Sequence, residues 1–233
     1  MINQFKRIVL LGGAVAFFLS LWLISLKFNW FSSGITTCAD CTQIISRHVS
    51  RSIILEDGDV LCIGKKGKFT GTIHRWDGQD TVIICNEGIF NPIKLNIHSG
   101  KNIIKNHGNM SPAYMRIFSK SDYNLIINYA GATLSPQKMY VGRSNYVVKN
   151  YGDFSPEKLH IPSESIVYNF QQANITNQKL RITGEGFVVN NGYWWVEEPL
   201  TEKELSRISN MGKMVTGGYP LGPNSNSGYE RAD

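Results

Sequence analysis

Short apolar segments recur along residues ~80 to 198, each ending in an asparagine and followed by glycine or other turn residues. Examples are Ile83-Ile84-Cys85-Asn86 and Val147-Val148-Lys149-Asn150. The asparagines in this position are Asn86, Asn106, Asn128, Asn150, Asn169 and Asn190. Their spacing gives a degenerate repeat of about 21 residues, and such a period indicates a solenoid.

A second signature follows in each copy, an apolar residue before Ser-Pro, as in Met110-Ser111-Pro112 and Phe154-Ser155-Pro156. It is degenerate at Ile175-Thr176-Asn177. Behind it comes an alternating apolar pair such as Leu159 and Ile161. Alternation with period two, broken by turn residues, is typical of short strands rather than helices.

Three short strands and three bends use about 20 to 25 residues, which is one coil of a parallel β-helix. The pattern therefore predicts an all-β chain with a right-handed parallel β-helix of about six coils over residues 52–198. Inward residues would stack on their counterparts one coil away, about 4.8 Å apart. The recurrent asparagines would form a structural ladder in one turn, with their amides bonding the backbone of adjacent coils.

Two other folds of similar repeat length fit less well. A leucine-rich repeat needs several leucines and a helical segment in each unit. A β-sandwich needs alternation over longer strands and does not explain asparagine and Ser-Pro positions that keep the same phase.

The flanking segments differ in pattern from the repeat. Lys6 and Arg7 precede an uncharged run at 8–26, so residues 1–34 are expected to be a signal peptide or an uncleaved membrane-anchor helix. Residues 35–51 would form an N-terminal cap with a short helix over 42–51. Residues 199–216 would be a short helical cap or linker, with a helix over 201–211 and Thr201 as its N-cap. Residues 217–233 would be a disordered tail.

Four cysteines in an exported chain are first interpreted as disulfides, and the candidates are Cys38, Cys41, Cys62 and Cys85. Cys62 and Cys85 lie about one coil apart, so they could stack and even bond. Neither the cysteines nor the five histidines show metal-ligand spacing, and we expect no metal and no cofactor.

The quoted repeat carries a resemblance, together with Gly58-Asp59-Val60-Leu61-Cys62-Ile63 and Phe69-Thr70-Gly71. The run from about 54 to 192 resembles the β-helix regions of secreted, adhesin-like surface proteins of Gram-negative gliding bacteria, within the pectin-lyase-like solenoid superfold. The resemblance implies export and a surface role.

Charge and acidic residues narrow the possible functions. The net charge is +6, but the basic residues are spread along the chain rather than gathered into a nucleic-acid-binding module, so no nucleic-acid partner is expected. Glycoside hydrolysis needs two carboxylates facing one cleft. Glu164 and Glu185, 21 residues apart, could stack, although a solvated face is the plainer role for them.

Two sets of residues are candidates for binding. Lysine occupies one repeat position in four copies, at Lys94, Lys138, Lys158 and Lys179, and could bind an anionic glycan or simply keep the face soluble. Tyr193, Trp194 and Trp195 could stack on sugar rings or cover the last coil.

The sequence therefore predicts an exported, non-catalytic β-helix protein of the cell envelope, cell surface or extracellular space, which binds a glycan or a partner protein. Membrane contact would involve only the N-terminal segment, if it is uncleaved. The alternatives are a polysaccharide lyase or hydrolase of the β-helix class and a structural envelope protein held by the anchor.

Overall fold

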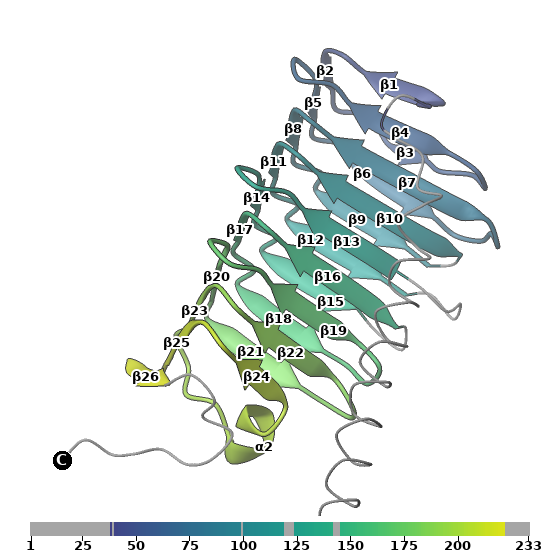
Figure 1. Ribbon diagram of the computed structural model, residues 1–233. Coiled ribbons are helices and arrows are strands. Elements are labelled where there is room, and N and C mark those ends of the chain that lie inside the picture. The colour runs from purple at the N-terminus through teal and green to yellow at the C-terminus, as the bar shows by residue number, and fades with distance from the viewer. Residues whose placement is uncertain (1–37, 39, 99, 119–123, 142–144, 222–233) are drawn as a thin grey trace, which may run out of the picture. The chain divides into compact units, whose positions relative to one another are not determined.

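A computed structural model describes residue 38 and residues 40–98, 100–118, 124–141 and 145–221 (Figure 1). The chain divides into two units, Met1–Asp40 and Cys41–Asp233, and all that follows concerns the second. The signal or anchor expected at 1–34 lies outside the described residues. No helix among the described residues is long and apolar enough to cross a membrane.

The second unit is a parallel β-helix built from three sheets, here called A, B and C, which the chain visits in turn (Figure 1). Sheet A contains β1 (Gln43–Ile45), β4 (Val60–Ile63), β7 (Thr81–Asn86), β10 (Lys101–Asn106), β13 (Asn124–Asn128), β16 (Tyr146–Asn150), β19 (Ile166–Asn169), β22 (Phe187–Asn190) and β24 (Ile208–Asn210). Sheet B contains β2 (His48–Val49), β5 (Lys68–Phe69), β8 (Ile89–Phe90), β11 (Asn109–Met110), β14 (Thr133–Leu134), β17 (Asp153–Phe154), β20 (Asn174–Asn177), β23 (Tyr193–Val196), β25 (Lys213–Thr216) and β26 (Tyr219–Leu221). Sheet C contains β3 (Ile53–Ile54), β6 (Thr72–Arg75), β9 (Lys94–Ile97), β12 (Tyr114–Ile117), β15 (Lys138–Val141), β18 (Lys158–Ile161) and β21 (Lys179–Ile182).

The predicted fold class is confirmed, but the β-helix is longer than the six coils expected. Sheet C has seven strands among the described residues, so seven coils contain all three strands. Two further coils at the C-terminal end contribute only to sheets A and B, through β22 with β23 and β24 with β25. The sequence pattern weakens in these outer coils because they lack the Ser-Pro signature.

Inward-facing residues form columns of like side chains, as the period-two pattern predicts. One column runs through sheet B, and its members Phe69, Phe90, Met110, Leu134, Phe154, Ile175, Trp194 and Met214 are all fully buried. Each buried Leu, Ile or Phe contributes about 1.5–3 kcal/mol through removal of its surface from water.

The structure places the recurrent asparagines in one continuous buried ladder. Each amide nitrogen donates to the amide oxygen of the next asparagine at 2.7–2.8 Å, from Asn86 through to Asn210. The same nitrogens also donate to backbone carbonyls of the next coil, such as that of Asp153 from Asn128. Asn210 extends the ladder one coil beyond the sequence pattern.

Both ends of the β-helix differ from the expected caps. Instead of a helix over 42–51, the chain forms β1 and β2, which pair in parallel with β4 and β5. At the other end α2 spans only Glu202–Leu205, with Thr201 as N-cap in a capping box. It stops early because Ile208–Asn210 returns to sheet A. Residues 219–221 of the expected tail form β26, antiparallel to β25; residues 222–233 lie outside the described residues.

The cysteines are oxidised, but not in the pairing that the coil spacing suggested. Cys62 and Cys85 are register partners on adjacent strands, as expected from stacking. Cys62, however, is bonded to Cys41, across 21 residues and one coil. Cys85 is also disulfide-bonded, and none of the cysteines is free. The reason is that β1 adds a coil before β4 and places Cys41 near Cys62.

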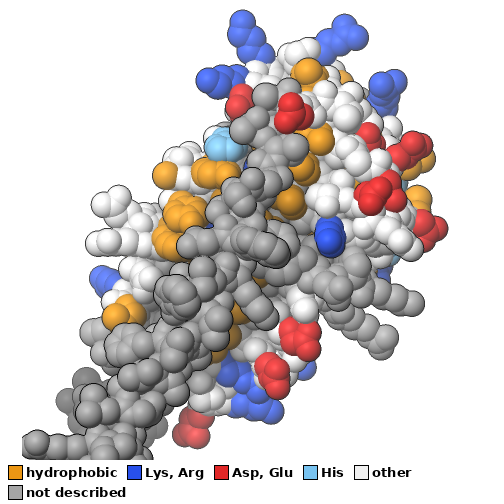
Figure 2. All heavy atoms as spheres, turned by 45° about the vertical axis from the view of Figure 1, so that its right-hand side comes forward, with side chains coloured by type: hydrophobic (Ala, Val, Ile, Leu, Met, Phe, Trp, Pro, Cys, Tyr) orange, Lys and Arg blue, Asp and Glu red, His pale blue; other side chains and the backbone are white. Residues whose placement is uncertain are grey.

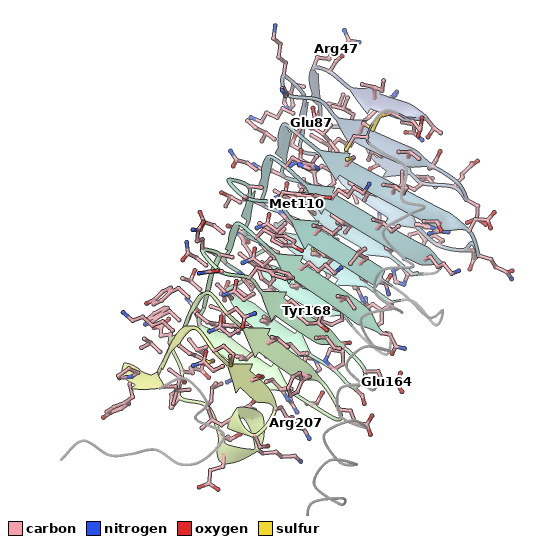
Figure 3. All side chains as sticks on the ribbon, viewed as in Figure 1. Arg47, Glu87, Met110, Glu164, Tyr168 and Arg207 are labelled. Atoms are coloured by element: carbon pink, nitrogen blue, oxygen red, sulfur yellow. A yellow bond between two sulfur atoms is a disulfide. The ribbon has the colours of Figure 1, made fainter. Side chains whose placement is uncertain are left out.

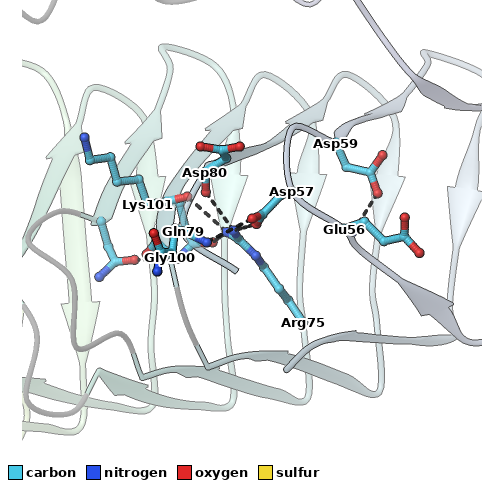
Figure 4. Close-up of polar contacts among 10 residues, drawn as sticks. Glu56, Asp57, Asp59, Arg75, Gln79, Asp80, Gly100 and Lys101 are labelled. Atoms are coloured by element: carbon cyan, nitrogen blue, oxygen red, sulfur yellow. Dashed lines mark hydrogen bonds and ion pairs between the residues drawn. The ribbon is translucent and has the colours of Figure 1, made fainter. Parts of the chain in front are cut away.

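A buried arginine, which the sequence pattern did not indicate, ties together the bends of three coils (Figure 4). Arg75 takes the inward position held by Ile97 in the next coil, and it is fully buried. Its guanidinium donates to Asp57 at 2.6 Å, to the Asp80 carbonyl at 2.7 Å and to the side-chain oxygen of Asn102 at 2.8 Å. The backbone N–H of Gln79 and the guanidinium of Arg75 lower the pKa of the Asp57 carboxyl.

Candidate functional site

A polar groove lies along the bend between sheets B and C, with a volume of about 350 Å³. Its lining repeats one polar position in each coil. Hydroxyl groups come from Ser135, Ser155 and Thr176, and this column ends at Trp195, the register partner of Thr176. Gln137, Glu157, Gln178 and Glu197 line the same groove. Hydroxyls and amides beside an aromatic ring are the groups that bind the hydroxyl-rich, partly apolar surface of a sugar.

Asn177 lines this groove and holds a buried donor without a partner. Its side-chain oxygen accepts the indole N–H of Trp194 at 2.7 Å. Because an indole nitrogen can only donate, this bond turns the amide NH₂ of Asn177 the other way. That nitrogen has no hydrogen-bond partner among the described residues, although Asn177 is only 3% exposed. An unpaired buried donor costs about 1–3 kcal/mol, but this nitrogen is closed off from solvent, so Asn177 serves the packing of Trp194 and not a ligand in the groove.

Asn177 was not singled out as a site residue by the sequence, although a signal was present. It stands where the other copies have the proline of Ser-Pro, as at Pro136 and Pro156. The deviation coincides with Trp194, one coil later, where the other copies have an aliphatic residue or phenylalanine. A buried indole needs an acceptor, and only a non-proline residue supplies one here.

The aromatic triplet at 193–195 divides into residues with different roles. Trp194 is fully buried in the core, where its ring fills the inward column of sheet B and is not on the surface that a ligand would contact. Trp195 is partly exposed and lines the polar groove. The Tyr193 ring lies 5.7 Å from the ammonium of Lys213 and lines neither groove. The triplet does not close the last coil, because β25 pairs with β23 beyond it.

A second hollow, the basic groove, lies on sheet C in the same coils and has a volume of about 190 Å³. Its lining includes Lys138, Lys158 and Lys179 and, two residues further along the same strands, Tyr140, His160 and Arg181. The two grooves adjoin because the chain places Gln137, Glu157 and Gln178 immediately before Lys138, Lys158 and Lys179.

Three of the four predicted lysines line the basic groove, and the fourth does not. Lys138 pairs in register with Lys158, and Lys158 with Lys179. Lys94 lies in the same row, but Tyr114 separates it from Lys138. Lys94 lines neither groove.

His160 contributes a neutral polar group to the basic groove. Burial and the nearby charge of Arg181 lower the pKa of this imidazole. Its Nε2 lies 2.9 Å from the hydroxyl of Thr183, which orients the ring. At neutral pH the positive charge of this groove therefore comes from its lysines and its arginine.

The acidic residues considered for catalysis lie elsewhere. Glu164 and Glu185 are exposed on the bend between sheets C and A, and Glu164 projects outward there (Figure 3). Figure 2 shows acidic side chains at several separate places on the face that it presents, some of them along its right-hand edge. Neither Glu164 nor Glu185 lines the polar or the basic groove. The polar groove has two carboxylates of its own, from Glu157 and Glu197. Their backbones are two coils apart, or about 10 Å along the coil axis.

The fold and these grooves define a β-helix protein with an elongated polar and basic surface. Comparison with protein-family models, curated proteins and solved structures gives no match for this chain.

Proposed function

We propose that this protein is an exported, non-catalytic β-helix that binds a glycan in the polar groove and acts at the cell surface or in the cell envelope, in the manner of an adhesin. The observation that carries the proposal is the column of hydroxyl groups at Ser135, Ser155 and Thr176 in a groove that ends at the partly exposed ring of Trp195. A sugar ring would stack on the indole, while its hydroxyl groups bond to the polar side chains of the column.

Two further features support the proposal. The oxidised cysteines favour an oxidising compartment outside the cytosol. The groove runs over four coils of a rigid scaffold, which suits an extended chain ligand more than a small molecule.

The test is a glycan array followed by titration of the best ligands, with wild-type protein and Trp195→Ala. Loss of the ring should weaken binding at least about fivefold, since aromatic contacts contribute about 1 kcal/mol or more. Trp76→Ala is the matched control, because Trp76 is also exposed but lies outside both grooves. Glycan binding that is equally strong in Trp195→Ala would refute the proposed site.

A polysaccharide hydrolase is the second candidate, favoured only by Glu157 and Glu197 in the polar groove. Neither carboxylate is buried, whereas a general acid usually needs burial to stay protonated at neutral pH. Release of reducing sugars by wild type, lost in Glu157→Gln, would establish catalysis instead of simple binding.

A further inference from the structure

The lysine row carries a charge pattern that does not help the β-helix to fold. Lys138, Lys158 and Lys179 are direct register partners, about 4.8 Å apart along the coil axis. Like charges placed opposite one another on neighbouring strands are destabilising. A sheet face that needed only solubility could alternate charges instead.

The protein's own acids balance this charge only in part. The Lys179 ammonium lies 2.7 Å from the Glu198 carboxylate, and both side chains are about half exposed. Lys138 and Lys158 form no ion pair with any residue that the structure describes. Arg181, in the same groove, adds a further positive charge. An anion in the basic groove would therefore relieve repulsion that is present in the free protein.

The basic and polar grooves are lined by neighbouring residues of the chain. At each of three successive coils a polar side chain of the polar groove is followed directly by a lysine of the basic groove. A polymer lying along the coil axis on this bend would meet the same pair of groups every 4.8 Å or so. The regular spacing suits a linear chain with charges at regular intervals.

We propose that the ligand is a linear acidic polysaccharide that lies along the coil axis, with a sugar ring on Trp195 and its carboxylate or sulfate groups on Lys138, Lys158 and Lys179. This inference rests on the proposed function and specifies its ligand class. A single-stranded nucleic acid fits less well, because such ligands need several free ring faces for base stacking. Trp195 is the one aromatic ring of the polar groove, and the exposed Trp76 is stacked against His74 and His98.

The test uses alginate, hyaluronate and carboxymethylcellulose, each compared with the same polymer after its carboxylates are capped as neutral amides. Binding of the full chain is measured by calorimetry at two salt concentrations. The charge variant is Lys138→Gln/Lys158→Gln, which keeps the length of the side chains. The matched control is Lys65→Gln/Lys66→Gln, two exposed lysines outside both grooves. A single-stranded DNA of similar length is titrated in parallel.

At least one acidic polymer should bind, more tightly at low salt, and lose at least about fivefold in affinity in the charge variant but not in the control. Equal affinity for the acidic and capped forms, weakened by Trp195→Ala, would overturn this inference and leave the proposed function intact. Absence of binding to every acidic polymer at low salt, or tighter binding to the DNA, would also overturn it.

Discussion

Replacing Asn128 by aspartate tests the asparagine ladder with almost no change in side-chain shape. Asn128 accepts a hydrogen bond from Asn106 and donates to Asn150 and to the Asp153 carbonyl, at 2.8, 2.8 and 2.9 Å. An aspartate can still accept the first bond, but as a carboxylate it cannot donate the other two.

The cost follows from those two lost bonds. Each net hydrogen bond contributes about 1 kcal/mol, and leaving buried acceptors without a donor adds at least a further ~1 kcal/mol. We therefore expect Asn128→Asp to lower the free energy of unfolding by about 3 kcal/mol at pH 7. A protonated aspartic acid would regain one donor, so burial should raise the pKa of this carboxyl above its unfolded value of about 3.9. The loss of stability should therefore be smaller at pH 4 than at pH 7.

The measurement is urea denaturation followed by circular dichroism at both pH values, with wild type as reference. Asn109→Asp is the control, because Asn109 is exposed on β11, in the preceding coil, and lies outside the ladder. A variant within about 0.5 kcal/mol of wild type at pH 7, or one destabilised equally at both pH values, would show that the ladder does not contribute as argued.

Three further predictions concern stability. Removing the disulfide with Cys41→Ser should cost about 3 kcal/mol by the loop-closure estimate for its separation of 21 residues, and an unchanged urea midpoint would contradict that estimate. Asp57→Ala should destabilise the protein more than Arg75→Met does, because the first change leaves a buried guanidinium without its countercharge; thermal unfolding that ranks them the other way would contradict the prediction. Burial lowers the pKa of His98, His107 and His160 below the ordinary 6.5, so the folded state favours neutral imidazoles. Their contribution to stability should therefore be present above about pH 6.5 and be lost as the pH falls further. A triple His→Gln variant should flatten that part of the melting-temperature profile, and an unaltered profile would show that other groups are responsible.

The parts of the fold that could be predicted from the sequence are those where one coil repeats its neighbour. The recurrent asparagines and the alternating apolar pairs, such as Leu159 and Ile161, are visible in the sequence because each must match the residue one coil before and one coil after it. The strand Gln43–Ile45 lacks these repeated residues, because the first coil has a neighbouring coil on one side only. The sequence pattern therefore predicts a cap at this position instead of a strand.

The candidate site could be predicted only in part, for the opposite reason. Lys138, Lys158 and Lys179 occupy the same position in successive copies of the repeat, so the sequence pattern identifies them. Asn177 and Trp195 each occur once, and their importance depends on which face of the strand they occupy and on what Trp194 requires. Residues that depart from the repeat consensus look like degenerate copies in the sequence, although such a residue can be the functional one.

The asparagine ladder also gives the β-helix a direction. Every amide from Asn86 to Asn190 donates toward the C-terminal end, so the six bonds form one polar chain of aligned dipoles. Turning a single amide around would oppose oxygen to oxygen on one side and nitrogen to nitrogen on the other. The seven side chains are therefore held in one common orientation, and each bond polarises the next. Adding or removing one coil would leave the direction of this chain of hydrogen bonds unchanged. A solenoid of this kind can therefore change its length without a change in the arrangement of its core.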